Sequence, residues 1–495
     1  MSKFLRNSVF FLIVGFSTIL HFKHFPKDLM SIHVWRQTQT QSTIDNFYEE
    51  DMNILNPKRN DRGDGDGIFR MEFPLMQWLV AVLFKIFGKH IIISRIFMFI
   101  VGLITTLGMY QLLQALFRRP VLSMIGAWTF TFSPSFFYYT INPLPDNLAL
   151  CLSLWGLVFF FQWYNKPKKW LLTLCGVFLS LGALCKLPFI AFYAIPLAYF
   201  AKRFLSTGNL SAKVISSAIR VFGLSILPLS WYASVIPDWS GNPIVQGMLN
   251  NQKSISKILD YYQHNLFSTL PELLLNYGSV LFFLSAFYFL IKKKAFRDAR
   301  FMFLVSLSAV LLAYFFFEVN AIAKIHDYYL FPFYPLLFVL VSYGAYHLIH
   351  SGGGKKYLAY ALLILLPITC YLRMQARWNP DAPGFNKDLL LFKEELRNAV
   401  PKDALVVAGN DESHFIFFYY IDKKGWGFHE DQLNFDQLLD MVNCGAEFLY
   451  SDSKKVSTNP VIAPLLEEMV IEKGSIKIFR LKSSPSRDLN EDMTP

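Results

Sequence analysis

The chain has 495 residues, of which 54% are hydrophobic, and its mean hydropathy is +0.34. This composition excludes an ordinary soluble protein, in which only one face of each helix is apolar. The formal net charge is +11. Much of the excess Lys and Arg lies in short clusters between apolar blocks, and no nucleic-acid-binding motif accompanies it, so we expect no nucleic-acid partner. The five cysteines show neither a disulfide framework nor the spacing of a metal site.

Apolar blocks recur along the chain, and many are long enough to cross a bilayer as a helix of about 20 residues. Hydropathy predicts an all-α polytopic bundle of about eleven transmembrane helices. The first is expected to remain uncleaved, because no small-residue cleavage site follows its basic start. The predicted spans are 4–21, 91–117, 121–141, 147–164, 169–185, 187–202, 217–236, 276–291, 300–317, 328–349 and 357–373.

Basic clusters flank these spans in a regular way. With the count above, all of them fall on one side of the membrane, which the positive-inside rule makes cytoplasmic. We therefore expect a multi-pass protein of the cell inner (plasma) membrane, with a cytoplasmic N-terminus. The clusters are Lys3 with Arg6, Arg118 with Arg119, Lys166 with Lys168 and Lys169, Lys202 with Arg203, the run KKKAFRDAR, and Lys355 with Lys356.

Three segments are then expected outside. Two are loops, at about 22–90 and 237–275, and the first contains a short apolar stretch, 73–88, that fits a helix lying at the membrane interface. The third is the tail, in which DALVVAG and AEFLY are typical of buried strands and NKDLLLFKEELRN and FDQLLDMV of amphipathic helices. We predict a transmembrane domain over 1–373 and a small periplasmic or extracellular α/β domain over 374–495.

Polar residues cluster near the predicted outer surface, where ionisable groups are costly and usually functional. In the segment from His33 to Gln39, Arg36 suits a phosphate because its planar fork binds oxygens bidentately, and Trp35 offers a face to sugar or isoprenoid. An interfacial aromatic with a snorkelling arginine is the alternative. Gln37 adds an amide to the same turn.

Four further groups have both a functional and a structural interpretation. Glu72 fits a general base or a helix cap, and Asp146 a substrate ligand or a helix cap. Lys186, between two short spans, needs an anion, either a lipid phosphate or a carboxylate. In the fourth group, His326 and Asp327 suit a proton shuttle or a divalent cation, whereas the adjacent Tyr328 and its neighbour also fit an aromatic belt.

The membrane part contains no glycine-rich phosphate loop and no nucleotide-sugar fold. Outside the cytoplasm there is no nucleotide supply, so a sugar carried on a lipid phosphate is the natural donor. Breaking its glycosyl–phosphate bond leaves an anionic lipid phosphate for Arg or Lys to stabilise, and a carboxylate or His must take the acceptor's proton. The outer-surface residues supply both types.

Residues 1–205 resemble the GT-C glycosyltransferases, in particular the branch of protein O-mannosyltransferases and lipid A aminoarabinose transferases (glycosyltransferase family 39). The likeness lies in a long outer loop after the first span, in EFPLMQWLVAVLFKIFG, where Glu72 and Gly88 match, and in LGALCKLPFIAFYAIPLAYF, where Lys186 matches. The resemblance implies inverting sugar transfer from a polyprenyl phosphate to a glycan, lipid or protein acceptor at the outer membrane face.

The chain departs from this family at the acidic residue expected soon after the first span, because that position falls near Gln37. Our first candidate for the base is Glu72, with His33 or Asp327 behind it and with Asp28 and Asp45 as other carboxylates of the loop. Arg36 and Lys186 are the candidates for the donor phosphate. Trp35, Gln37, Asp146, His326 and Tyr328 are the candidates for substrate binding, and a metal ligand set is not assigned. Rival interpretations are a transporter or flippase of lipid-linked saccharides and a non-catalytic scaffold.

Overall fold

The computed structural model describes residues 3–208, 211–239, 247–248, 253–294, 298–411, 413–429 and 432–482. It divides into two compact units. The helical unit contains Met1–Lys27, Met71–Met76 and His90–Ala376, and the loop–tail unit contains Asp28–Arg70, Gln77–Lys89 and Arg377–Pro495. Most of the expected first outer loop therefore belongs to the same unit as the tail. The contacts within the chain thus divide it differently from the predicted single domain boundary after residue 373.

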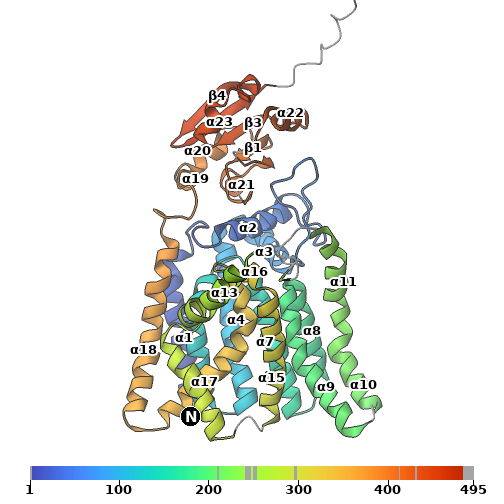
Figure 1. Cartoon of the computed structure of the whole chain (residues 1–495), viewed down its shortest axis with the longest axis vertical. Helices are drawn as coiled ribbons and strands as arrows, with labels where there is room; N and C mark the ends of the chain where they lie inside the picture. Colours follow the sequence, from blue (N-terminus) through green and yellow to red (C-terminus); the bar gives the residue numbers. More distant parts are fainter. Residues whose placement is uncertain are drawn as a thin grey trace, which may run out of the picture. The chain divides into compact units, whose positions relative to one another are not determined.

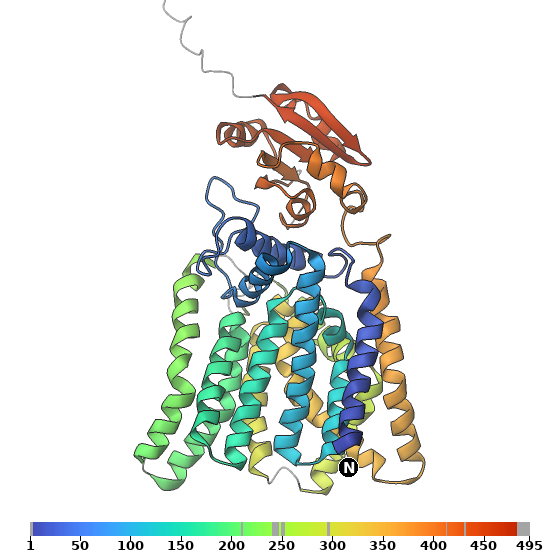
Figure 2. The ribbon, with the colours of Figure 1, turned by 180° about the vertical axis from the view of Figure 1, so that it is seen from behind.

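The helical unit is built from long apolar helices (Figures 1 and 2). Seven helices in the described part of the chain are long and apolar enough to cross a membrane, or eight if one bent pair counts as a span. The helices are α1 (Lys3–His21), η1 (Phe22–His24), α4 (Ile91–Phe117), α5 (Pro120–Thr131), α6 (Pro134–Tyr139), α7 (Pro145–Asn165), α8 (Lys169–Cys185), η2 (Leu187–Tyr193), α9 (Ala194–Thr207), α10 (Ala212–Phe222), η3 (Gly223–Ser225), α11 (Ile226–Val235), η4 (Ile236–Trp239), α13 (Ile255–His264), η5 (Asn265–Leu274), α14 (Gly278–Lys292), α15 (Ala299–Phe317), α16 (Val319–Ile322), η7 (Asp327–Phe333), α17 (Tyr334–Ile349), α18 (Gly353–Gln375) and η8 (Ala376–Trp378).

Small residues allow α7 and α8 to pack closely. A Cβ atom on Gly182 of α8 would lie 2.2 Å from the Ser153 hydroxyl and 3.2 Å from the Ala149 carbonyl oxygen of α7. A Cβ atom on Gly156 of α7 would lie 2.6 Å from the Leu179 side chain of α8. Close backbone approach through glycine is the usual basis of helix association in membranes. It fixes the start of α7 beside the end of α8.

The sequence had suggested a loop over 237–275, but the described part of this stretch is largely helical. Its described part contains η4, α13 and the π-helical η5, and η5 leads into α14 with a bend of 110°. Polar residues at helical spacing and Pro271 concealed these helices, because they lower the mean hydropathy without preventing helix formation. Residues 240–246 and 249–252 of this stretch, and 295–297 of the basic run before α15, lie outside the described residues.

The loop–tail unit combines a five-stranded sheet with helices. The strand order is β2-β1-β3-β5-β4, with β2, β1 and β3 parallel and β5 and β4 antiparallel. The predicted α/β fold of the tail is confirmed. Its elements are α2 (Val34–Glu49), α19 (Asp388–Leu391), α20 (Lys393–Asn398), β1 (Leu405–Gly409), α21 (Ile416–Ile421), β2 (Lys424–Gly427), α22 (Phe435–Asn443), β3 (Phe448–Ser451), α23 (Lys454–Thr458), η9 (Ala463–Leu465), β4 (Leu466–Lys473) and β5 (Ile476–Leu481), while α3 (Leu75–Phe87) runs from the helical unit into this one.

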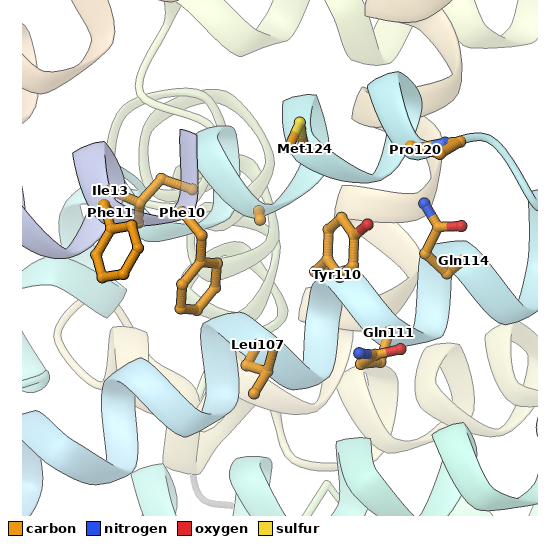
Figure 3. A pocket seen from close by; sticks show the side chains of 10 residues that line it. Phe10, Phe11, Ile13, Leu107, Tyr110, Gln111, Gln114, Pro120 and Met124 are labelled. Carbon is orange, nitrogen blue, oxygen red and sulfur yellow. The ribbon is translucent and has the colours of Figure 1, made fainter. Parts of the chain in front are cut away.

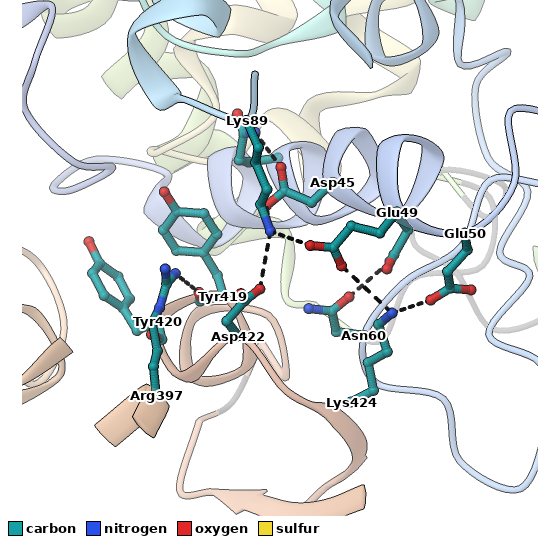
Figure 4. A network of polar contacts seen from close by, with 12 residues as sticks. Asp45, Glu49, Glu50, Asn60, Lys89, Arg397, Tyr419, Tyr420, Asp422 and Lys424 are labelled. Carbon is teal, nitrogen blue, oxygen red and sulfur yellow. Dashed lines mark hydrogen bonds and ion pairs between the residues drawn. The ribbon is translucent and has the colours of Figure 1, made fainter. Parts of the chain in front are cut away.

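Polar contacts join the first loop to the tail within this unit (Figure 4). The Lys89 ammonium lies 2.9 Å from Glu49, 3.3 Å from Asp422 and 3.4 Å from Asp45. Glu50 accepts from Lys424 and Arg62, whose charges and hydrogen bonds outweigh the effect of burial and lower the pKa of Glu50 to about 2. Residues near Asn60 extend the sheet, because the Gly425 amide donates to the Asn60 carbonyl at 3.1 Å.

Candidate active site

A cavity of about 240 Å³ in the helical unit collects several of the predicted site residues. It contains Glu72 and Lys186 and is otherwise lined mainly by aromatic and aliphatic side chains. Such a cavity suits a ligand with one polar group and an apolar remainder. Its lining residues are Met71, Glu72, Lys186, Leu187, Pro188, Ile190, Ala191, Tyr232, Trp239, Val310, Tyr314, Glu318 and Tyr329.

Lys186 lies at a break between two helices, as predicted. α8 ends at Cys185 and η2 begins at Leu187, with the extended Lys186 between them and Pro188 at the start of η2. Its Nζ lies 3.8 Å from Glu72 Oε2, 3.8 Å from Asp146 Oδ2, and 5.4 Å from the centre of the Tyr329 ring. The ammonium therefore lies between two carboxylates and over one aromatic face, and its side chain is only 11% exposed.

Hydrogen bonds to the backbone hold Glu72 in place. The Phe73 amide donates to the Leu184 carbonyl at 3.1 Å, and the Trp231 indole N–H donates to the Met71 carbonyl at 3.0 Å. The Phe73 and Trp231 rings pack edge to face at 5.1 Å. The carboxylate is thus fixed beside the end of α8 by the residues before and after it.

Asp146 lies in the first turn of α7, and it does not act as the cap of that helix. α7 begins at Pro145 without a side-chain cap, whereas Asp146 faces Lys186. The preceding turn is held by Arg95, which is fully buried and donates to the Ile141 carbonyl at 3.1 Å and to the Asn142 side chain at 2.7 Å. The buried arginine therefore orders the turn that presents Asp146.

Asp327 and His326 occupy different surroundings. Asp327 is buried and accepts hydrogen bonds from the Tyr139 hydroxyl at 2.7 Å and from the Ser135 hydroxyl. His326 Nδ1 lies 2.6 Å from the Ala321 carbonyl oxygen, and its ring stacks on Tyr329 at 5.1 Å. These contacts make Asp327 part of the packing between α6 and η7, and they place His326 one ring away from the cavity.

The adjacent tyrosines Tyr328 and Tyr329 have different neighbours, and Tyr329 is the one of the two that lines the cavity. The Tyr328 ring packs edge to face against Tyr139 at 5.7 Å, on the Asp327 side, whereas Tyr329 lines the cavity. Successive residues of a 3-10 helix such as η7 project about 120° apart, so adjacent tyrosines face different neighbours. The sequence did not reveal which of the two reaches the cavity.

The segment His33–Gln39 belongs to the loop–tail unit, where it starts α2. His33 has a positive φ of 57°, and its ring lies 6.4 Å from that of Trp35. Arg36 donates to the Gln39 side chain, and Gln37 Nε2 donates to the Ile32 carbonyl at 2.9 Å. The segment is therefore helical rather than a loop. A role for Arg36, Trp35, Gln37 or His33 at the cavity stays a prediction.

The two alternative loop carboxylates have partners within the loop–tail unit. Asp45 accepts from Gln41 at 2.8 Å, and burial raises its pKa to about 6 against the opposing charge of Lys89. Asp28 accepts from the Tyr419 hydroxyl at 2.6 Å and from Lys393. Burial alone would raise the pKa of Asp28, but the Lys393 charge and these hydrogen bonds hold it below its usual value. Asp28 therefore joins the first loop to the tail, whereas the partners of Asp45 lie in the loop itself.

Glu318 is a cavity residue that sequence reasoning missed. It follows directly after α15, and burial raises the pKa of its carboxyl to about 7. Its only signal in the sequence is one carboxylate at the end of a long apolar run, AVLLAYFFFE. The aromatic lining from α11, η4 and α15 (Tyr232, Trp239 and Tyr314) had no distinguishing signal at all, because aromatics are abundant throughout the spans.

Two further observations bear on the site. Among the described residues, no group of three or more His, Cys, Asp or Glu side chains is arranged to hold a metal ion. A larger cavity of about 500 Å³ lies between α1, α4 and α5, and Figure 3 shows its lining of Phe10, Tyr110, Gln114, Met124 and other uncharged side chains. Its lining residues include no Asp, Glu, His, Lys or Arg.

Comparison with known proteins agrees with this fold. The family model described as dolichyl-phosphate-mannose-protein mannosyltransferase matches residues 72–231, which include Glu72, Asp146 and Lys186. No curated protein sequence matches the chain significantly.

Solved structures give a match over nearly the whole chain. ArnT from Cupriavidus metallidurans is 11% identical with a TM-score of 0.64, and the match covers 96% of this chain and 98% of that one. The same protein has been solved bound to undecaprenyl phosphate, at 10% identity and a TM-score of 0.65, with 95% and 97% covered. The Archaeoglobus fulgidus oligosaccharyltransferase is 14% identical with a TM-score of 0.60, covering 92% and 71%. The chain therefore has the GT-C fold of these membrane glycosyltransferases.

Proposed function

We propose that the protein transfers a sugar from a polyprenyl-phosphate donor to a glycan, lipid or protein acceptor. The observation that carries this proposal is the position of Lys186 between Glu72 and Asp146, in a cavity whose remaining wall is mostly aromatic and aliphatic. A cation at one point and an apolar wall elsewhere match a lipid phosphate, which has a charged head and a hydrocarbon chain. The undecaprenyl phosphate bound to the similarly folded ArnT supports this choice of donor.

The residues of the cavity divide the chemistry between them. Lys186 would stabilise the negative charge that gathers on the lipid phosphate as the glycosyl–phosphate bond breaks. Glu72 would take the proton of the acceptor as it attacks, because its carboxylate is fixed beside Lys186 by its neighbours' backbone bonds. Asp146 would orient Lys186. Binding of the donor phosphate by Arg36 and binding of a divalent cation stay further proposals.

The orientation and number of spans complete the proposal. We infer eleven spans in an inner (plasma) membrane, with α1, the α5–α6 pair and α8 added to the eight spans that include the bent pair. In both overall views, the N-terminus lies at the same end of the helical unit as the α17–α18 connection, which Lys355 and Lys356 follow (Figures 1 and 2). Basic residues at that end favour a cytoplasmic N-terminus.

The test is a transfer assay with purified protein and a panel of polyprenyl-phosphate sugars. Glu72→Gln should lower kcat by roughly 100-fold or more, because general-base catalysis contributes on that scale. Lys186→Gln should lower kcat/KM for the donor. The matched controls Glu272→Gln and Lys324→Gln change a carboxylate and an ammonium that pair elsewhere in the helical unit, with Arg373 and Asp260, and they should retain activity. Failure to use any donor, or full activity of Glu72→Gln, would refute the proposal.

A further inference from the structure

A basic pocket of about 490 Å³ lies at the opposite end of the α7–α8 pair from the candidate active site. The active-site residues Asp146 and Lys186 mark the start of α7 and the end of α8, whereas this pocket lies where α7 ends and α8 begins. A helix of the length of α8 separates the two by roughly 25 Å. The pocket is lined chiefly by Arg118, Gln162, Asn165, Lys166, Lys168 and Trp170.

Asn165 organises the cations of this pocket. Its side-chain oxygen accepts from Arg118 at 3.0 Å and from Arg300 at 3.2 Å, and its amide nitrogen donates to the Ala115 carbonyl at 2.6 Å. Arg300 also donates to the Leu116 carbonyl at 2.5 Å. One asparagine, anchored to the end of α4, therefore orients two guanidinium groups from different helices. Such preorganisation reduces the entropy that a bound anion would otherwise cost.

The cations of this pocket have no carboxylate partner in the part of the chain that the structure describes. Among the described residues, no carboxylate lies within 4.0 Å of the charged groups of Arg118, Lys166, Lys168 or Arg300. The nearby Asp298 accepts a hydrogen bond from the backbone amide of Arg300, as the cap of α15, and not from its guanidinium. Four cations thus converge at one place, and an anion from outside the chain would balance them.

The surroundings favour a lipid over a soluble anion. The pocket opens at the ends of membrane helices, and the Trp170 side chain beside it is 54% exposed. Tryptophan is enriched where the bilayer meets water, and basic pockets between helices on the cytoplasmic side of membrane proteins hold anionic headgroups. We propose that this pocket binds the phosphate headgroup of an anionic glycerophospholipid of the inner leaflet, with Arg118, Lys166 and Lys168 as its cationic ligands and Asn165 as the residue that positions Arg118.

The proposal is tested by native mass spectrometry of the full chain, released from detergent with phosphatidylglycerol or phosphatidylcholine of the same acyl chains. The wild type should retain phosphatidylglycerol preferentially. The triple variant Arg118→Gln/Lys166→Gln/Lys168→Gln should bind it roughly tenfold more weakly or worse, because each cation near the headgroup adds to the attraction. Asn165→Ala keeps every charge and should also weaken binding, which separates an organised site from simple charge attraction.

A second triple variant serves as the matched control. Lys202→Gln/Arg203→Gln/Lys355→Gln removes the same charge from exposed residues outside the pocket, and it should bind phosphatidylglycerol like the wild type. Equal losses in the two triple variants, unchanged binding by Asn165→Ala, or equal retention of phosphatidylcholine would overturn the proposal. The proposal would also be overturned if an acidic polypeptide, but not phosphatidylglycerol, protected Arg118 and the two lysines from chemical labelling. Thermal unfolding in lipid-free detergent shows that each variant is folded. The outcome is independent of the transfer assay.

Discussion

At the scale of single residues, Glu318 links the candidate active site to pH. Its carboxyl lines the cavity with Lys186, and burial raises its pKa to about 7. The carboxyl of Glu318 is therefore mostly protonated and neutral at pH 6 and mostly ionised at pH 8. The ionised form adds a negative charge to a cavity that we propose to hold a lipid phosphate, and like charges in a low dielectric repel strongly.

We expect the KM for the polyprenyl-phosphate donor to increase as the pH rises through about 7, by roughly threefold to tenfold between pH 6 and pH 8. Glu318→Gln removes the titrating group and should keep the KM near its low-pH value across this range. Steady-state kinetics at several pH values measure both effects, with Glu272→Gln as the control. A KM in Glu318→Gln that follows pH as steeply as in the wild type would contradict this role.

The predicted site residues that lie at or beside the cavity share a simple signal in the sequence. Glu72, Asp146 and Lys186 are charged groups at the borders of long apolar runs, where a charge is costly and therefore informative. Glu318 has the same signal but stands alone, without a second polar neighbour to mark it. The sequence analysis named Tyr328, rather than Tyr329, as a candidate for substrate binding. Which tyrosine reaches the cavity depends on the rotation of one helix against another. Rotation is set by packing, which hydropathy does not report.

At the scale of elements, hydropathy located the membrane helices well and the polar helices poorly. The predicted spans 91–117 and 169–185 coincide with α4 and α8. Helix α2 escaped prediction because it carries Gln, Thr and Ser on most of its surface, and yet most of these side chains are buried. A buried polar helix has no apolar stripe, so neither its periodicity nor its composition separates it from a loop.

The packing of α7 against α8 gives a prediction at this scale. Valine in place of Gly182 would push its side chain into the Ser153 hydroxyl and the α7 backbone. The two helices carry Asp146 and Lys186, so Gly182→Val should separate these residues as well as destabilise the unit. We expect a clear fall in melting temperature and a loss of at least tenfold in kcat/KM, since overpacking costs about 1–3 kcal/mol and displaces the reacting groups.

Gly15 provides the matched control for this substitution. It also lies within an apolar helix, α1, but a Cβ atom built on it has nothing within 4 Å. Gly15→Val should therefore leave both the melting temperature and kcat/KM close to the wild-type values. Equal effects of the two substitutions would show that helix propensity, rather than the α7–α8 contact, governs the response.

At the scale of the whole molecule, the first loop and the tail form one unit, although residues in contact, such as Asp28 and Tyr419, lie more than 300 positions apart in the sequence. No pattern in the sequence predicts that the first loop and the tail associate. Each contact pairs one residue of the loop with one of the tail, such as Trp426 with Asp64 at 2.9 Å, and such pairs leave no local signal. The α/β fold of the tail was predictable from its own sequence pattern, whereas its association with the first loop was not.

Two tyrosines of α21 test whether this unit is cooperative. The Tyr419 hydroxyl donates to Asp28 at 2.6 Å, and the Tyr420 hydroxyl donates to the Leu29 carbonyl. In the variant Tyr419→Phe/Tyr420→Phe, both donors are lost while the rings stay. Each lost bond costs about 1 kcal/mol, so amide hydrogen exchange should become at least roughly fivefold faster in α2 as well as in α21. Mass spectrometry of peptides from these helices measures the change, and Tyr357→Phe, at a ring that is 72% exposed in the helical unit, is the control. Faster exchange confined to α21 would mean that the loop keeps its structure without the tail. Faster exchange in both helices would mean that the tail holds the loop in its folded form.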